Sequence, residues 1–235
     1  MREQIVLSPV TPCEYLPDRL SRHRYEVDVA LRPADYMERM AAGWRRFGPV
    51  LFQPDCPDCR MCQSLRIPIE TFTPNESQRR AWKKNVREVT IRIGTPTVTP
   101  DKQQLFADFH QHGHDTKGWP RNDARLHLFV SNPFETEEWS YYLGDRLIAV
   151  GYVDQLFKGL SAIYFYYDPA ERHRSLGTFN ILALIVSARL RRLPHVYLGY
   201  YVEGCRSLEY KARFGPSEVL QPDGAWVPFT PPPVR

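Results

Sequence analysis

Alternating hydrophobic and polar positions predict several strands in the first ninety residues. The alternation from Arg24 to Arg32 and the apolar stretch from Leu65 to Ile69 are typical of strands. Between them, apolar residues at helical spacing predict a helix from Pro33 to Arg46. A second helix is expected to begin near Asn75, which is a favourable N-cap residue, and to lead into a strand from Val89 to Ile93.

The second half of the chain has a clearer pattern. Two apolar stretches, Ser140 to Leu143 and Leu147 to Asp154, flank Gly144-Asp145 and predict a hairpin. An aromatic strand from Leu160 to Tyr167, an apolar helix from Thr178 to Arg191 and a strand from Val196 to Tyr200 are expected to follow.

This order resembles the acyltransferase fold of the N-acetyltransferase type, in which a helix opens after a strand and a glycine-containing loop. We therefore expect an α+β protein whose GNAT-like C-terminal half packs on a cysteine-containing α/β N-terminal half. The stretch 94–103 contains glycine and prolines typical of a linker. The expected units are an N-terminal domain, 1–94, and a C-terminal catalytic domain, 103–227.

The composition is typical of a globular protein and bears on the compartment in which it is expected. The chain has 235 residues, of which 43% are hydrophobic and 13% aromatic, so it can bury a full core. No apolar run approaches the roughly 18 residues that a membrane helix needs, and no signal peptide is evident at the start. We therefore expect a cytoplasmic protein with no membrane partner. The net charge of +4 permits a polyanionic partner without requiring one.

Three cysteines lie at a three-residue period. Cys56, Cys59 and Cys62 form a C-x2-C-x2-C motif, and Cys13 could supply a fourth thiolate. Four thiolates suit tetrahedral zinc or an iron–sulfur cluster. The alternative is a set of reduced cysteines that pack a loop.

Five cations on the second predicted helix recur at a spacing that places them on one face. Such a face can contact the phosphates of a nucleic acid, or it can simply be solvated. An arginine in it could instead bind a carboxylate in a bidentate pair. The five residues are Arg79, Arg80, Lys83, Lys84 and Arg87.

The strand from Val196 to Tyr200 leads into a loop rich in polar and charged groups. A rigid strand that delivers such groups into a loop is a common way to build a site. The alternative is a buried strand followed by a solvated basic loop. The loop carries Glu203, Cys205, Tyr210, Lys211 and Arg213.

Several segments of the chain resemble, in order, the motifs of the aminoacyl-tRNA–protein transferases, and in particular their bacterial branch. The resemblance extends from near residue 13 to near residue 226. The segments are Cys13-Glu14-Tyr15-Leu16-Pro17-Asp18-Arg19, Cys56 to Cys62 with Arg66-Ile67-Pro68, Ser77-Gln78-Arg79-Arg80, Tyr167-Asp168-Pro169 with Ser175-Leu176-Gly177-Thr178, Leu198-Gly199-Tyr200, and Tyr210-Lys211-Ala212-Arg213-Phe214.

This resemblance implies transfer of an aminoacyl group from a charged tRNA to the N-terminal α-amine of proteins that begin with Asp or Glu. The product would be a signal for proteolysis. Leucyl-tRNA is the favoured donor, and arginyl-tRNA is the alternative because Tyr200 to Cys205 is similar to the arginyl-transferring branch. The partners are then aminoacyl-tRNA and acidic protein N-termini, with no DNA. Transfer itself requires no cofactor.

Roles follow from residue type at the matched positions. Glu203 or Asp168 would take the proton of the amine, while Tyr167, Tyr210 and Lys211 order the ester and the tRNA end. Arg79, Arg80 or Arg213 would hold the acidic side chain, and Lys83, Lys84 and Arg87 would contact tRNA. Ser175, Gly177 and Thr178 complete the expected substrate-binding set.

Two other classes of function compete with this hypothesis. The segment Arg174 to Phe179 partly matches the coenzyme A-binding loop of acetyltransferases, but Phe179 occupies its final small position. This departure argues against ordinary coenzyme A binding. The other alternative is a noncatalytic, metal-stabilised RNA-binding module, in which changes at Tyr210 or Lys211 would affect binding only.

Overall fold

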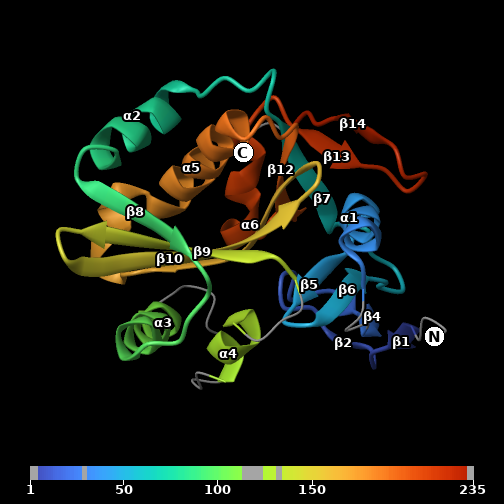
Figure 1. Cartoon of the computed structure of the whole chain (residues 1–235). Coiled ribbons are helices and arrows are strands. Elements are labelled where there is room, and N and C mark those ends of the chain that lie inside the picture. The colour runs from blue at the N-terminus through green and yellow to red at the C-terminus, as the bar shows by residue number, and fades with distance from the viewer. Residues whose placement is uncertain (1–4, 28–30, 113–123, 131–133, 232–235) are drawn as a thin grey trace.

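An eight-stranded sheet runs through both halves of the chain. The computed structural model describes residues 5–27, 31–112, 124–130 and 134–231 (Figure 1). The strands of the sheet, in spatial order, are β14 (Trp226–Pro228), β13 (Glu218–Leu220), β7 (Gln63–Pro68), β12 (His195–Tyr201), β11 (Gly159–Tyr167), β10 (Arg146–Leu156), β9 (Thr136–Leu143) and β8 (Val89–Gly94).

Strand β7 comes from the N-terminal part of the chain but lies inside this sheet. It is antiparallel to both β12 and β13, and Leu65 and Ile67 are fully buried. Because β8 also belongs to the sheet, residues 1–94 and 103–227 share one set of strands. The division into two domains stays a prediction.

Helices cover both faces of the sheet. Figure 1 shows α2 (Glu76–Asn85) and α5 (Leu176–Leu190) on one face, and α3 (Pro100–His112) and α4 (Ala124–Val130) on the other. Helix α5 is buried around most of its circumference, as its apolar sequence requires. Its side chains and those of β7, β9, β10 and β12 form the main core.

A smaller sheet and one helix complete the N-terminal region. The sheet has the order β1 (Ile5–Leu7), β4 (His23–Val27), β6 (Val50–Pro54) and β5 (Arg45–Phe47), and a further pair joins β2 (Thr11–Pro12) to β3 (Leu20–Ser21). Helix α1 (Pro33–Ala41) packs its buried face against Leu51 and Tyr197. Strand β12 therefore contacts the N-terminal region as well as the main core.

The prediction of a helix as far as Arg46 is wrong. Helix α1 ends at Ala41, and Gly43 has a φ of +89°, a conformation that glycine adopts without strain. The chain then turns, and Arg45 and Arg46 lie in β5. Of the strand expected over 24–32, residues 28–30 lie outside the described part.

The other long predicted elements are confirmed with shifts of a few residues at their ends. Asn75 caps α2 through a capping box with Gln78. The hairpin is β9–β10, and β11, α5 and β12 follow in the predicted order. The mixed α+β character is also confirmed. The short elements were not predicted: α4, the 3₁₀ helix η1 (Pro169–Arg174), α6 (Arg206–Glu209), the 3₁₀ helix η2 (Tyr210–Arg213), β13 and β14.

A buried ion pair joins the small N-terminal sheet to β10. The Arg46 guanidinium on β5 donates through Nε and Nη2 to both carboxylate oxygens of Asp154 at 2.5 Å, and both side chains are fully buried. The hydroxyls of Tyr36 and Thr136 donate to the same carboxylate. The carboxylate is thus fully hydrogen-bonded, which a buried charge requires.

None of the helices within the described residues is long and apolar enough to cross a membrane.

We expect Asp154→Asn to lower the free energy of unfolding by about 3–5 kcal/mol, because it leaves the buried Arg46 charge without its counter-ion. Denaturant unfolding of the purified protein measures this loss. Glu76→Gln is the matched control, since it breaks the exposed Arg80–Glu76 pair and should change stability by about 0–1 kcal/mol. An equally small effect of both substitutions would contradict the structural role of the buried pair.

Candidate active site at the ends of two central strands

The candidate site lies where β11 and β12 cease to pair. The two strands are parallel, and they pair over Gly159–Ser161 of β11 and His195–Tyr197 of β12. Both strands then continue, to Tyr167 and to Tyr201. In sheets with parallel strands, ligands bind near the carboxyl ends of strands where the topology opens in this way. The predicted site residues 167–178 and 203–213 directly follow these two ends.

The segment after β11 is held by hydrogen bonds of Asp168. Its Oδ1 accepts from the Ala170 amide at 2.9 Å and so caps η1, and its Oδ2 pairs with Arg146 at 2.5 Å. Both oxygens therefore have partners, which favours a structural role for Asp168 over that of a proton acceptor. Ser175 begins α5 with a φ of +56°, and its side chain makes no cap bond.

Two tyrosines and the first turn of α5 come together. The Tyr210 hydroxyl lies 4.0 Å from the position that a Cβ would take on Gly177, and Tyr210 and Tyr167 both pack against the main core. Burial, followed by the neighbouring Tyr167, raises the pKa of Tyr210 to about 12. The Tyr210 hydroxyl therefore stays protonated near neutral pH and can donate a hydrogen bond. Thr178 is half-buried in the same turn, and Ser175 is exposed.

Lys211 is hydrogen-bonded to the backbone of β12. Its ammonium donates to the Tyr200 carbonyl at 3.1 Å, and it lies 3.7 Å from the Cβ position of Gly199. The Arg45 guanidinium, from β5, lies 3.8 Å from the same position. Burial, and then the Arg45 charge, lower the pKa of Lys211 to about 7, while Cys205 acts in the opposite direction. Arg45 was not identified from the sequence, because it was assigned to the end of a helix.

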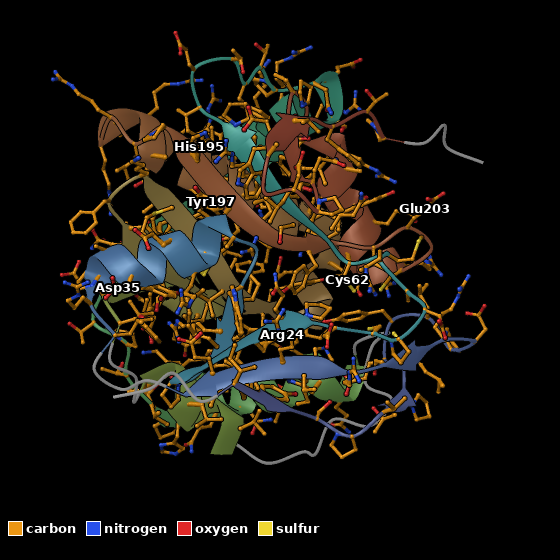
Figure 2. The ribbon with its side chains drawn as sticks, turned by 90° about the vertical axis from the view of Figure 1, so that its right-hand side faces the viewer. Arg24, Asp35, Cys62, His195, Tyr197 and Glu203 are labelled. Carbon is orange, nitrogen blue, oxygen red and sulfur yellow. The ribbon has the colours of Figure 1, made fainter. Side chains whose placement is uncertain are left out.

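Glu203 is exposed in the loop after β12. Figure 2 shows it at the same side of the molecule as Cys62, with His195 at the other end of β12. Burial, followed by the charges of Glu203 and Glu209, raises the pKa of Tyr201. Of the two predicted proton acceptors, Glu203 is the solvent-facing one.

Helix α2 is attached directly to the turn that carries Tyr210 and Lys211. The side-chain amides of Asn75 and Gln78 both donate to the Arg213 carbonyl, at 3.3 and 3.0 Å. The first turn of α2 is therefore fixed against η2, and the basic stripe begins beside the candidate site.

The members of the basic stripe differ in their contacts. Arg79 donates to the Pro74 carbonyl, Arg80 pairs with Glu76, and Lys84 donates to the His173 carbonyl at 2.7 Å. Lys83, Arg87 and also Arg213 have exposed side chains. Lys84 thus helps to hold α2 against η1, while Lys83 and Arg87 face solvent.

The cysteines gather around Cys62. Burial raises the pKa of the Cys62 thiol to about 12, and the charges of Cys56, Cys13, Cys59 and Cys205 act in the same direction. Cys205 also belongs to this group, although its distance in the sequence from the other four cysteines gave no sign of it. Within the described residues, no three Cys, His, Asp or Glu side chains are arranged to hold a metal ion. The zinc or iron–sulfur hypothesis stays a prediction.

Comparisons with known proteins agree along nearly the whole chain. The family model for the N terminus of arginine-tRNA-protein transferase matches residues 11–80, and the model for its C terminus matches residues 101–221. An aspartate/glutamate leucyltransferase of Nitrosococcus oceani is 37% identical over 94% of this chain and 93% of its own. One of Campylobacter jejuni is 35% identical over 89% of each chain.

Among solved structures, that of L-PGS from Bacillus licheniformis aligns with a TM-score of 0.46 at 11% identity, covering 64% of this chain and 50% of its own.

We expect the Lys211 amine to titrate near pH 7. An amine reacts with acylating reagents only when it is deprotonated, so its labelling should rise through neutral pH, well below the ordinary range of lysine. Competitive labelling between pH 5 and 10, with digestion and mass spectrometry, measures this titration.

Arg45→Gln should raise the pKa of Lys211, because it removes the nearest cation. The exposed Lys83 and Lys158 provide internal references in the same digest. A Lys211 profile that is identical in the parent and in Arg45→Gln would contradict the proximity of the two charges.

Proposed function

The chain belongs to the arginine-tRNA-protein transferase family, and we propose that it transfers leucine from leucyl-tRNA to proteins that begin with Asp or Glu. The observation that carries this proposal is the match, at 35–37% identity over about nine-tenths of both chains, to aspartate/glutamate leucyltransferases. Arginyl-tRNA is the second candidate donor, because the family models are described by that activity. The leucylated product would then serve as a signal for proteolysis, and the reaction would take place in the cytoplasm, where charged tRNA is found.

The reaction requires little chemistry from the protein, because an aminoacyl ester is already activated. The neutral α-amine of the acceptor attacks the ester carbonyl, a C–N bond forms, and the bond to the ribose oxygen breaks. The amine loses a proton and the ribose oxygen gains one. The enzyme must align the two substrates and stabilise the oxyanion of the tetrahedral intermediate.

The tyrosines at the strand ends suit the oxyanion. Tyr210 remains a protonated donor near neutral pH, and Tyr167 lies beside it at the start of the η1 segment. The amides of the first turn of α5 offer further donors, since helix N-termini favour negative charge. Glu203, or water beside it, takes the proton of the amine.

A GNAT-like C-terminal half is supported by the order of its elements. Three antiparallel strands, β9 to β11, precede α5, and β12 then pairs with β11 in parallel. The alternative of a coenzyme A-dependent acetyltransferase is disfavoured by Phe179. Its ring is buried against Trp82 and Tyr141, so the position that is small in coenzyme A-binding loops is filled by a core side chain.

A direct assay tests the proposed function. Purified protein is given radiolabelled leucyl-, phenylalanyl- or arginyl-tRNA and peptides that differ only in an N-terminal Asp, Glu or Ala. We expect leucine on the Asp and Glu peptides and none on the Ala peptide, because only the acidic acceptors fit the proposed specificity. Preferential transfer of arginine would establish the second candidate, and tRNA binding with no transfer to any peptide would favour the noncatalytic RNA-binding module.

We expect the exposed part of the basic stripe to contact tRNA phosphates. The double variant Lys83→Ala with Arg87→Ala should weaken tRNA binding and reduce the slope of log affinity against log salt by about two, since each lost phosphate contact removes about one unit. Filter binding over a salt series measures the slope.

Lys158→Ala is the matched control for this double variant. Lys158 is an exposed cation in the β10–β11 turn, at the other end of β11 from η1, and its removal should leave the slope unchanged. An unchanged slope in the double variant would mean that this face of α2 is only solvated.

A further inference from the structure

Arg45 is a buried cation with two unused nitrogens. Its exposed fraction is 5%, and Nε and Nη2 are buried without a hydrogen-bond partner among the described residues. Leaving a buried charged group incompletely hydrogen-bonded is costly. Such a group in a folded protein calls for an explanation, and a bound anion is the simplest chemical one.

The third nitrogen fixes the orientation of the guanidinium. Nη1 donates to the carbonyls of Trp44 and Met40, at 2.6 and 3.2 Å. These two bonds hold the planar group so that its Nε–Nη2 edge is free. This edge presents two parallel N–H groups at the spacing of the two oxygens of a carboxylate.

A second cation shares this location. The Arg45 Nε and the Lys211 Nζ both lie within 3.8 Å of the Cβ position of Gly199, so they are at most 7.5 Å apart. Neither residue makes an ion pair within the described part of the chain. Burial lowers the pKa of both groups, as expected for cations without a counter-ion.

A glycine lies where the two cations approach each other, and a Cβ there would be in contact with both of them. Gly199 has a φ of +78° and follows a register shift in the pairing of β12 with β7. With no side chain at Gly199, the two charged groups face the same space. Tyr200 lines it, with the Arg45 guanidinium 5.5 Å from its ring. Lys211 is only partly buried, whereas Arg45 and Tyr200 are buried.

We propose that Arg45 and Lys211 bind the side-chain carboxylate of the acceptor's first residue. This inference rests on the proposed function and assigns its acidic specificity to two residues. The Arg45 edge would take the carboxylate in a bidentate pair, and the Lys211 ammonium would add a second, more adaptable charge that suits both Asp and Glu. Because Tyr210 is the neighbour of Lys211, the acceptor's α-amine would lie close to the proposed oxyanion donors.

The location also explains why the exposed arginines are poorer candidates for this role. Arg79 and Arg80 already have local partners, and Arg213 is exposed. An exposed ion pair contributes about 0–1 kcal/mol, too little to reject a neutral side chain strongly. A site whose cations are already desolvated discriminates better, because a neutral amide would leave them without a counter-ion.

The test compares acceptor peptides that begin with Asp, Asn, Glu or Gln. We expect Arg45→Gln to lower kcat/KM for the Asp and Glu peptides by roughly ten- to a hundredfold, with little change for Asn and Gln. Lys211→Met should also lower the preference for acidic over amide acceptor peptides. Arg189→Gln is the control, because Arg189 is an exposed arginine that donates to the Ile69 and Phe72 carbonyls elsewhere in the fold. It should leave the preference intact.

The ratio of acidic to amide acceptors separates specificity from a loss of folding, since misfolding lowers transfer to all peptides. If Arg45→Gln does not fold, Arg45→Lys replaces it, because lysine keeps the charge but lacks the two parallel N–H donors of the guanidinium. A reduced Asp over Asn ratio in that variant supports the proposal. An Asp over Asn ratio that equals that of the parent protein in both Arg45→Lys and Lys211→Met would overturn the proposal. So would tRNA binding that weakens in Arg45→Gln while the Asp over Asn ratio stays intact, because the site would then take an anion of the tRNA.

Failure of the proposed function has a different signature, namely that the parent protein transfers leucine to none of the peptides. Equilibrium binding of the Asp and Asn peptides to the parent and to Arg45→Gln then decides the present proposal. Tighter binding of the Asp peptide that depends on Arg45 supports it. Equal binding of the two peptides by the parent overturns it.

Discussion

The antiparallel pairing of β7 with β12 is the constraint on which the candidate site depends. A strand from residues 63–68 lies between β12 and β13, which both come from the last third of the chain. Its pairing shifts register between Tyr197 and Gly199, so β12 carries one extra residue there. Such an irregularity bends a strand and redirects its side chains. At this position Gly199 lies beside Arg45 of β5 and Lys211 of η2.

Helix α2 connects the two segments that follow β11 and β12, namely η1 and η2. Its cap residues are used twice, because Asn75 and Gln78 complete a capping box and also donate to the Arg213 carbonyl. At the far end of the helix, Asn85 and Lys84 donate to carbonyls in η1. The segments after β11 and after β12 are thereby held to the same helix, and that helix carries the exposed cations proposed to contact tRNA.

Local signals explain which elements could be predicted from the sequence. The apolar pattern of α5 and the cap of α2 are properties of neighbouring residues, so both helices were predicted to within a few positions. Strands β13 and β14 are three residues each, too short to show a period. Strand β13 forms because β7 offers a partner, and β14 then pairs with β13. The end of α1 depended on one glycine whose positive φ became evident only in the structure.

The same distinction applies to the site residues. Tyr210, Lys211 and Gly177 could be named because the resemblance pointed to their segments, and the structure brings Tyr210 and Gly177 together. The structural role of Asp168 could not be assigned in this way, since its partner Arg146 comes from the hairpin and is brought to it only by the fold. Arg45 had no local signal. That a cation is buried, and that its neighbours leave it unpaired, are facts of tertiary structure.

Arg45 and Arg46 show how adjacent, chemically identical side chains can serve opposite purposes. Arg46 faces Asp154 and is fully paired, so it joins β5 to β10 and stabilises the contact between the two sheets. Arg45 points to the other side of the same short strand and has no carboxylate partner within the described residues, which costs stability. Proteins retain such a cost where function requires an unsatisfied group. The paired neighbour fixes the strand, and a fixed strand is what allows an unpaired guanidinium to remain oriented until a ligand neutralises it.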